Sequence, residues 1–496
     1  MWRVYLVLSM WSVGGVSANV ISIAQGQVRG VKHDGYISYH GIPYASAGRK
    51  QRFKGAGLAP TWADVLPPQH STCSLSSPAS ECLQLDVHMP SSASNLLPVL
   101  VWVKGGSGQY RAGKLVKQGI IVVVVSHRIG AEGFLCSDDP RIPGNAGVKD
   151  VVQALRWVRD NIIGFRGNPA QVVVGGQSFG AAMVEALTLS PISQENLYRG
   201  VILQSGSVLS PWAFHYDARE RTRALADMLQ GDDDFISNII STSPMNLLSK
   251  ARAINFSYFP FGMCVEKAFK SEERFMSQTP YSLLKSGKVR DIPILVGYNS
   301  GEANIFLPAL RRVVRKLPEK TGILLPDELS NLGKRNTQPL INDIKKIYFN
   351  NGSRTTMLGL LAYHRDAYFL NHIYRSVRMH ATASALPIYF YQFSYMGSKG
   401  MGDPAGSKSG ATHSDELAYL FPERDFDYEG PDGTIQKMLI TLWTNFVKYL
   451  EPSPSWRPVD ARAPRLLDIS TSPQMIDFPY NAEMDFWDQV YERYYY

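Results

Sequence analysis

Ser178, Glu302 and His413, in this order along the chain, have the residue types of a catalytic triad. The hydroxyl of a serine is a weak nucleophile until a base takes its proton and an acidic group orients that base. Ser178 lies between Gly176 and Gly180 in a Gly-x-Ser-x-Gly pattern, and a carboxylate and an imidazole follow later in the sequence. In such an arrangement the serine would attack an acyl carbon and form a covalent intermediate.

The residues on both sides of Ser178 favour a turn between a strand and a helix. Residues 171–175 contain three consecutive valines, which is the composition of a buried strand. Residues 181–187 are good helix formers, and Ser190-Pro191 ends the run. A plain glycine turn is the alternative. The strand before and the helix after are typical of a nucleophile elbow, which lifts the serine hydroxyl out of the backbone.

Glu302 and His413 are the candidate acid and base because of the loops that contain them. Glu302 follows a predicted strand at 294–297, and α/β sheets collect their active sites at the C-terminal ends of strands. An ordinary exposed loop carboxylate is the alternative for this residue. Of the ten histidines, only His413 lies in a glycine-rich polar loop late in the chain, at 410–417. The others lie mostly near the N-terminus or in predicted helices, where a structural role is expected.

The composition predicts a large folded core and argues against several classes of partner. The 496 residues are 45% hydrophobic and 19% charged, which does not favour disorder. The formal net charge is +8, but the basic residues are scattered. Their densest group, at 311–316, is interrupted by apolar residues and indicates a solvated amphipathic face rather than a nucleic-acid site. No metal-binding or phosphate-binding motif occurs, so we expect no metal, no cofactor and no nucleic-acid partner.

The N-terminus indicates export to an oxidising compartment. Residues 1–18 have a short basic start, an apolar stretch and a small-residue cleavage site, which predicts a signal peptide. The apolar stretch is shorter than a transmembrane helix needs, so we expect a secreted, extracellular protein without a membrane anchor. Asn255 and Asn351 begin Asn-x-Ser patterns and are candidate glycosylation sites. The cysteines, which allow three pairings, are Cys73, Cys82, Cys136 and Cys264.

Apolar strands alternate with helical stretches along most of the chain. Residues 120–125 are six consecutive β-branched residues, and the apolar positions of 150–163 fall on one face of a helix. This alternation predicts an α/β protein with a mostly parallel central sheet flanked by helices. Residues 215–290 and 305–380 are more helical and polar, and predict helical cap segments. We find no repeat, linker or composition break, and interpret residues 19–496 as one domain.

Many short motifs resemble the type-B carboxylesterases, the family of cholinesterases and insect esterases. The matching segments are Gly41-Ile42-Pro43-Tyr44-Ala45, Arg52-Phe53, Glu81-Cys82-Leu83, Gly144-Asn145-Ala146-Gly147, Ala154-Leu155-Arg156-Trp157-Val158, Gln204-Ser205-Gly206-Ser207, His413-Ser414-Asp415-Glu416-Leu417 and Trp443-Thr444-Asn445-Phe446. They extend over nearly the whole chain after the predicted signal peptide. The resemblance implies an α/β-hydrolase fold, a small-molecule ester as substrate, and Ser178, Glu302 and His413 as the triad.

A narrower similarity is to the juvenile hormone esterases of insects. It rests on Gln177 before the nucleophile, on Arg52-Phe53, and on the spacing of Gly410, His413 and Glu416. The chain departs from this subgroup at two positions. Val151 stands where a glutamine is usual, and Phe179 stands where a small residue follows the nucleophile.

The resemblance also implies an oxyanion hole made of backbone N–H groups. Where the family has a triple glycine, this chain has Lys104-Gly105-Gly106-Ser107. A serine preserves a backbone donor if its backbone angles are allowed, so we expect Gly106, Ser107 and Phe179 to bind the oxyanion. The connection from Gln109 to Gly119 is shorter than is usual in the family.

The family's N-terminal disulfide bridge implies a bond between Cys73 and Cys82, although the loop between them is contracted. These cysteines flank a turn-like Ser-Ser-Pro. We expect Cys136 and Cys264 to be free or weakly paired.

Phe179 places an aromatic ring beside the space where the ester carbonyl would react. If the ring faces that space, it should narrow the acyl side of the site and favour small acyl groups. The alternative is that the ring packs into the core behind the elbow, since most buried aromatic rings serve packing.

The leading hypothesis is a secreted serine esterase that acts through an acyl-enzyme intermediate. A narrower form of this hypothesis is an esterase specific for a hormone-type or odorant-type ester. The alternative is a non-catalytic or weakly active protein of the same fold, acting in ligand binding or adhesion. The altered oxyanion loop keeps this alternative open, because the loss of an oxyanion donor weakens catalysis severely.

Overall fold

The computed structural model describes residues 19–69, 73–106, 110–193, 195–229, 234–253, 260–313, 325–326, 329, 332–349, 356–400, 409–424 and 427–496. Four sequence predictions lie outside these residues. They are the signal peptide at 1–18, the oxyanion residue Ser107, and the glycosylation sites Asn255 and Asn351. The predicted basic face at 311–316 is described only in part.

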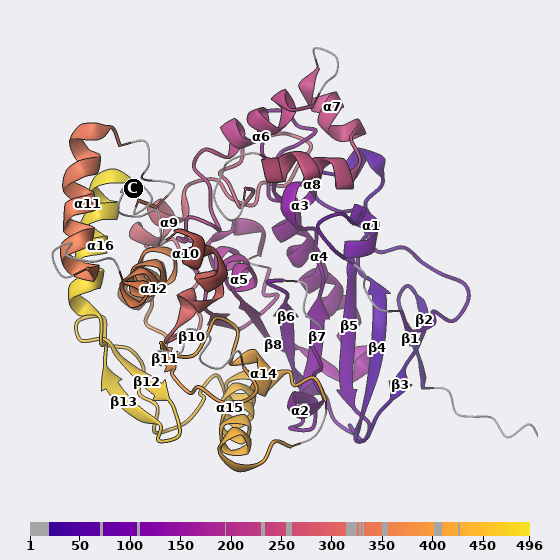
Figure 1. Cartoon of the computed structure of the whole chain (residues 1–496). Helices are drawn as coiled ribbons and strands as arrows, with labels where there is room; N and C mark the ends of the chain where they lie inside the picture. Colours follow the sequence, from indigo (N-terminus) through magenta and orange to yellow (C-terminus); the bar gives the residue numbers. More distant parts are fainter. Residues whose placement is uncertain are drawn as a thin grey trace, which may run out of the picture.

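A large mixed β-sheet runs through the middle of the molecule (Figure 1). The strands are β1 (Val20–Ile23), β2 (Gly26–Arg29), β3 (Val31–Lys32), β4 (Tyr36–Pro43), β5 (Gln84–Pro90), β6 (Leu97–Val103), β7 (Ile121–Val125), β8 (Gly167–Gln177), β9 (Gly200–Gln204), β10 (Ile294–Asn299), β11 (Ile388–Phe393), β12 (Arg465–Ile469) and β13 (Gln474–Asp477). Within the described residues, the order across the sheet is β13-β12-β11-β10-β9-β8-β6-β7-β5-β4-β3, and β1 and β2 form a separate hairpin. The strands from β12 to β7 are parallel, whereas the edges are antiparallel. The prediction of a mostly parallel central sheet is confirmed.

The central strands carry apolar side chains on both faces of the sheet, and both faces are covered by helices. In β6, Val99, Val101 and Val103 belong to one buried cluster, and Leu100 and Trp102 belong to the other. Successive side chains of a strand point to opposite faces, so a continuous apolar run fills two cores at once.

Helices pack on both faces of this sheet. On the face of Trp102 they are α2 (Gly113–Val116), α14 (Leu417–Leu420) and α15 (Gly430–Tyr449). The other described helices are α1 (Ala79–Cys82), α3 (Gly130–Phe134), α4 (Ala146–Asn161), α5 (Phe179–Leu189), α6 (Ala218–Asp227), α7 (Phe235–Ser241), α8 (Pro244–Ala253), α9 (Pro280–Lys285), α10 (Leu307–Val313), α11 (Lys334–Tyr348), α12 (Met357–Arg365), α13 (Asn371–Ala383) and α16 (Asn481–Tyr494). Short 3₁₀ helices cover Arg49–Gln51, Ile162–Phe165, Pro191–Ser193 and Glu302–Phe306, and Asp366–Leu370 form a π-helical turn. Helices α6, α7 and α8 gather at one end of the molecule (Figure 1).

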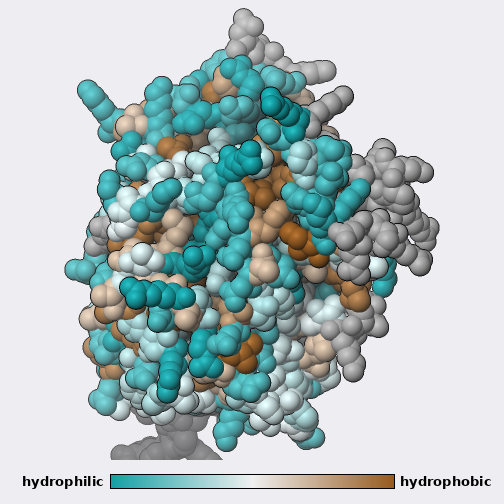
Figure 2. Space-filling model, turned by 90° about the vertical axis from the view of Figure 1, so that its left-hand side faces the viewer, coloured by the Kyte–Doolittle hydropathy of each residue, from teal (hydrophilic) through white to brown (hydrophobic). Residues whose placement is uncertain are grey.

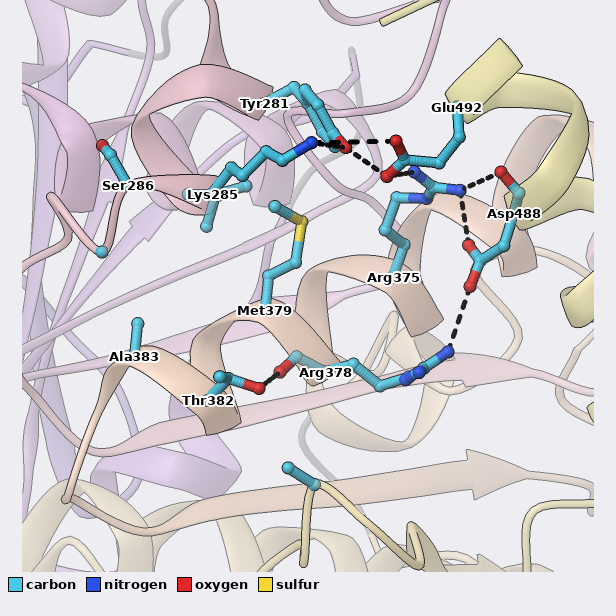
Figure 3. Close-up of a pocket in the computed structure, with 13 residues that line it drawn as sticks. Tyr281, Lys285, Ser286, Arg375, Arg378, Met379, Thr382, Ala383, Asp488 and Glu492 are labelled. Carbon is cyan, nitrogen blue, oxygen red and sulfur yellow. Dashed lines mark hydrogen bonds and ion pairs between the residues drawn. The ribbon is translucent and has the colours of Figure 1, made fainter.

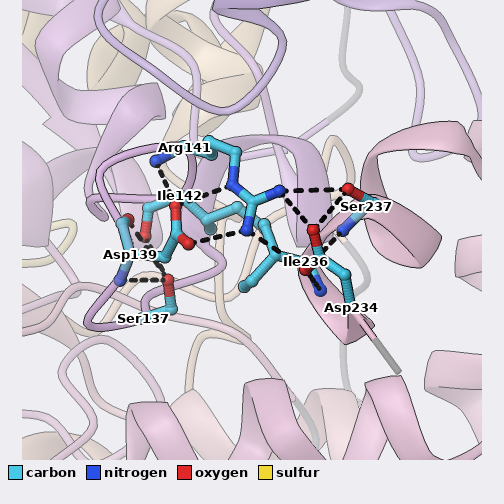
Figure 4. A network of polar contacts seen from close by, with 7 residues as sticks. All are labelled: Ser137, Asp139, Arg141, Ile142, Asp234, Ile236 and Ser237. Carbon is cyan, nitrogen blue, oxygen red and sulfur yellow. Dashed lines mark hydrogen bonds and ion pairs between the residues drawn. The ribbon is translucent and has the colours of Figure 1, made fainter. Parts of the chain in front are cut away.

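Arg141 ties the loop after α3 to the start of α7 (Figure 4). Its guanidinium lies 2.7 Å from Asp139 and 2.7 Å from Asp234. Asp234 also accepts hydrogen bonds from the backbone N–H groups of Ile236 and Ser237, at 3.2 and 3.3 Å, and so caps α7. The hydrogen bonds from Arg141 and Ser237 lower the pKa of Asp234. Because these groups are solvated, we assign them a role in orienting α7 rather than a large contribution to stability.

The cysteines form two disulfides, Cys73–Cys82 and Cys136–Cys264. The expectation that Cys136 and Cys264 are free or weakly paired is wrong. These two cysteines are 128 residues apart in sequence, so their proximity comes from long-range packing. The side chain of Asn145 contributes to this packing. Its Nδ2 donates to the carbonyl of Cys264 at 2.8 Å, and its Oδ1 accepts from the backbone N–H of Cys264 at 3.0 Å.

The surface carries mostly hydrophilic side chains on the face shown in Figure 2, with apolar side chains in small groups. Among the described residues, no helix combines the length and the apolar character needed to cross a membrane.

Candidate active site

Ser178 lies in the turn between β8 and α5, with φ 60° and ψ −127°. A positive φ is uncommon for a residue other than glycine, and such strain is typical of a nucleophile elbow. The turn needs glycine on both sides, because a Cβ on Gly176 would lie 2.6 Å from the carbonyl carbon of Gly180. The sequence pattern thus produces a sharp strand-to-helix turn with Ser178 at its apex.

The end of β9 supports the elbow from the side. The backbone N–H of Ser178 donates a hydrogen bond of 2.8 Å to the carbonyl of Gln204. A Cβ on Gly206 would lie 2.2 Å from the carbonyl oxygen of Ser178, so glycine permits this close approach. The segment after β9 therefore fixes the turn from one side.

His413 and Glu302 form a buried pair. His413 Nδ1 lies 2.5 Å from Glu302 Oε2, and the backbone N–H of Asn299 donates to Glu302 Oε1 at 2.7 Å. Glu302 is fully buried, and 9% of the His413 side chain is exposed. Because a carboxylate accepts the Nδ1 proton, the free lone pair of a neutral ring is on Nε2.

Two loops that are distant in sequence hold this pair. The backbone N–H of Gly301 donates to the carbonyl of Ala411 at 2.8 Å, and that of Ala411 donates to Ser300 Oγ at 3.0 Å. Asn304 Nδ2 adds a hydrogen bond of 3.1 Å to the carbonyl of Gly410. The segment after β10 and the loop before α14 are thereby joined side by side.

The pKa of His413 reflects two opposing effects. Burial favours the neutral ring and pulls the pKa down. The carboxylate of Glu302, with the charges of Glu416 and Asp415 behind it, outweighs burial and raises the pKa above its ordinary value. A carboxylate that stabilises the imidazolium is what a base needs when it takes a proton from a serine.

Glu416 is a second buried carboxylate behind the pair, and sequence reasoning gave it no role. It accepts hydrogen bonds from Asn299 Nδ2 at 2.5 Å and from Gln204 Nε2 at 2.9 Å. Burial, reinforced by the negative charge of Glu302, raises the pKa of Glu416 to about 7. Its spacing of three residues after His413 was the only signal in the sequence.

Gln177 is a further residue whose contact the sequence did not predict. Its Nε2 lies 3.0 Å from His413 Nε2. Since Nδ1 of the ring donates to Glu302, the amide N–H₂ of Gln177 donates to the lone pair on Nε2. Among the described residues, Ser178 Oγ has no hydrogen bond to His413. In this structure the glutamine beside the serine occupies the ring nitrogen that faces the elbow.

The predicted oxyanion loop touches the elbow. A Cβ on Gly105 would lie 1.9 Å from the carbonyl oxygen of Gln177, so the two backbones are in direct contact. His127 Nε2 is 2.9 Å from the carbonyl of Lys104 and holds the start of the loop. Phe179 is the first residue of α5, and the N-terminus of a helix presents its backbone N–H groups to an anion. Ser107 lies outside the described residues.

A cavity of about 620 Å³ opens beside this loop. It reaches Gly105 and Gly106 after β6, residues 129–132 and Phe134 after β7, and Phe179 after β8. Helix α8 closes its other side. The ring of Phe179 lines the cavity and also packs edge-on against Phe134, with ring centroids 4.9 Å apart. With 9% of its surface exposed, Phe179 thus borders the cavity and also packs in the core, and its effect on the acyl group stays a prediction.

A sequence profile described as "Carboxylesterase family" matches residues 17–487. The chain belongs to the carboxylesterase family. It is a carboxylic ester hydrolase with the α/β-hydrolase fold, as the resemblance in its motifs implies.

Insect esterases are among the proteins to which this carboxylesterase is similar. It is 28% identical to Esterase FE4 of Myzus persicae over 85% of the chain and 82% of that protein. It is 25% identical to the juvenile hormone esterase of Heliothis virescens, over 89% and 87% of the two chains. The structure of juvenile hormone esterase from Manduca sexta with OTFP covalently attached superposes with a TM-score of 0.85 at 25% identity, over 95% of this chain and 99% of that one.

A second cavity of the carboxylesterase, of about 540 Å³, lies between α9, α13 and α16 (Figure 3). Arg375 and Arg378 reach toward Asp488 in this cavity, at 2.6 and 3.0 Å, and Glu492 lies beside them. None of the described residues of the predicted active site lines it. Within the described residues, no group of three or more His, Cys, Asp or Glu side chains could hold a metal ion.

Proposed function

We propose that this carboxylesterase is a secreted serine esterase whose triad is Ser178, Glu302 and His413. One observation carries the proposal. The buried pair of His413 and Glu302 lies next to the strained turn that contains Ser178. His413 Nε2 is 3.0 Å from the side chain of Gln177, the residue before Ser178. A base with an orienting carboxylate, next to a serine on an elbow, is the arrangement that acyl transfer requires.

The proposed reaction begins when His413 Nε2 accepts the Ser178 proton as Oγ attacks the ester carbonyl carbon. Glu302 keeps the proton on Nδ1 and stabilises the imidazolium. Backbone N–H groups of Gly106, Ser107 and Phe179 receive the negative oxygen of the tetrahedral intermediate. The alcohol leaves with the proton from His413, and water then releases the acid from Ser178 by the same route.

The proposal of secretion is supported by the leader-like composition of residues 1–18 and by two disulfides among the described residues. We also propose that residues 19–496 form one domain. Its support is one hydrophobic cluster that contains residues from β4 to α16. No linker composition interrupts this span.

For the substrate we propose a hormone-type or odorant-type ester. The support is the similarity to two juvenile hormone esterases, together with the mostly apolar residues that line the cavity beside the oxyanion loop. A second candidate is ligand binding without turnover, which the contact between Gln177 and His413 favours because it occupies the base.

Covalent labelling with an organophosphate distinguishes the two candidates. We expect a single adduct on Ser178 and progressive loss of aryl-ester hydrolysis. Ser178→Ala and His413→Ala should each reduce kcat by about a thousandfold or more, and the double variant should be little worse, since triad members act as a unit. Turnover retained by purified Ser178→Ala protein would rule out the mechanism, and the absence of both labelling and hydrolysis would favour the binding protein.

A further inference from the structure

Among the described residues that line the cavity beside the oxyanion loop, one carboxylate lies in a mostly apolar wall. Its apolar lining includes Phe134, Leu247 and Phe261, and Leu75, which is 45% exposed, also lines it. Glu132, on α3, lines the same cavity, and its side chain is only 6% exposed. Charged groups are rarely buried unless they are paired, so both oxygens of this carboxylate need partners.

Only one of the two oxygens has a partner among the described residues. Arg52 Nε donates to Glu132 Oε1 at 2.8 Å, and Arg52 Nη2 donates to the same oxygen. The third nitrogen of Arg52 is directed elsewhere, to the carbonyls of Ile240 and Thr242 at 2.7 and 2.5 Å. Glu132 Oε2 is buried and accepts no hydrogen bond from any described residue.

An ionised oxygen without a hydrogen bond is costly, and a donor supplied by a ligand would remove that cost. The residues around the cavity indicate which kind of donor. Arg52 already compensates the charge of Glu132, and Arg252 of α8 lines the same cavity with a second positive charge. An ammonium group would therefore find little net attraction, whereas a neutral hydroxyl gains a charge-assisted hydrogen bond without repulsion.

We propose that Glu132 Oε2 accepts a hydrogen bond from a hydroxyl group on an otherwise apolar part of the ester substrate. The proposal deepens the proposed function and rests on it. The ester carbonyl would lie at Gly106 and Phe179, and the hydroxylated chain would extend along the cavity toward α3 and α8. A carboxylate placed in an apolar wall selects the hydroxylated ester over an analogue that lacks the donor.

The test measures Kd for intact esters with Ser178→Ala protein, so that turnover plays no part. The probes are octanoate and octyl esters that carry either a hydroxyl or a fluorine at successive chain positions. Fluorine is close to hydroxyl in size but cannot donate a hydrogen bond. At the position that reaches Glu132, we expect the hydroxyl ester to bind about tenfold or more tightly than its fluoro partner.

Glu132→Gln in the same background identifies the acceptor. A glutamine keeps an oxygen for Arg52 and presents an N–H₂ group in place of Oε2, which cannot accept the proton of the ligand's hydroxyl. The charge-assisted hydrogen bond is lost, so the Kd ratio should fall well below its value with Glu132. Glu272→Gln is the matched control, because Glu272 is likewise paired with a basic side chain, that of Lys54, and does not line this cavity. This control should retain the ratio.

Equal Kd values for hydroxyl and fluoro esters at every position would overturn the proposal, and this comparison needs no change at Glu132. A ratio that survives in folded Glu132→Gln protein would also overturn the role of that carboxylate. Failure of the proposed function gives a different result, which is absence of Ser178-dependent hydrolysis in the wild-type protein whatever the Kd ratios are.

Discussion

Gln177 Nε2 lies 3.0 Å from His413 Nε2, so an amide occupies the ring nitrogen that accepts the serine proton in the proposed mechanism. The other ring nitrogen donates to Glu302, which leaves the amide as the donor in this contact. In the proposed mechanism this contact opens or is shared when Ser178 reacts. Gln177 therefore lies where it can influence the basicity of His413.

Gln177→Glu should move the acid limb of the kcat/KM profile to higher pH. A carboxylate next to Nε2 stabilises the imidazolium and raises the pKa of His413, so more of the base is protonated at a given acidic pH. The measurement is aryl-ester hydrolysis over a range of pH. Gln177→Met is the matched control, since it removes the amide without adding charge. The acid limb of its kcat/KM profile should not move to higher pH. An acid limb that is the same in the glutamate variant and the wild type would contradict the assignment.

Glu416 should make stability depend on pH in a specific direction. Its folded-state pKa of about 7 lies above the ordinary value of 4.5, so the folded protein keeps a proton that the unfolded chain releases. The stability that this proton contributes is fully present below pH 4.5, the pKa of the glutamate in the unfolded chain. It is lost as the pH rises through about 7, the pKa in the folded protein. Relative to Glu416→Gln, the wild-type free energy of unfolding should fall by up to about 3 kcal/mol across this window.

Denaturant unfolding of both proteins at several pH values measures this difference. Glu423→Gln, a change at an exposed glutamate, is the control and should keep a constant difference from the wild type. A constant difference for Glu416→Gln as well would show that this carboxyl group does not titrate in the window.

Phe179→Ala should change both selectivity and stability, because the ring lines the cavity and packs against Phe134. We expect the butyrate-to-acetate ratio of kcat/KM to rise by about tenfold, and the free energy of unfolding to fall by about 3 kcal/mol. Phe165→Ala is the control, since Phe165 is fully buried and does not line this cavity. It should lose similar stability without a change in the ratio. If the ratio also stays constant in Phe179→Ala, the ring does not limit the acyl group.

The two disulfides should contribute unequally to stability. Cys136 and Cys264 close a loop with a sequence separation of 128, and Cys73 and Cys82 close one of 9. In the chain-entropy treatment, replacing the first pair by alanine costs about 4 to 5 kcal/mol and the second pair about 3 kcal/mol or less. Peptide mapping without reduction checks the pairing itself. A peptide that joins Cys82 to Cys136 or to Cys264 would contradict both bonds.

The parts of the fold and site that depend on neighbouring residues were predictable. The strand, the glycines around Ser178 and the following helix are contiguous, so their composition indicates the turn directly, and the run of β-branched residues at 120–125 indicates a buried parallel strand. Contacts between distant segments were not predictable in this way. Gln177 and His413 are 236 residues apart, and nothing local to either one indicates their contact.

The same limit applies to the Cys136–Cys264 disulfide and to the pair of Arg52 and Glu132. Each depends on how loops between separate strands pack. The raised pKa of Glu416 depends in addition on complete burial beside Glu302, which has no signature in residue type.

The contact between Gly105 and the carbonyl of Gln177 has a practical consequence for engineering the specificity of this enzyme. Any side chain at Gly105 would push the loop away from the elbow, so a mutant library should leave this position unchanged. At Gly106, a Cβ would meet none of the described atoms within 4 Å, and this residue lines the cavity. Randomising Gly106 alone is therefore a route to reshaping the binding space while the backbone of the elbow stays in place.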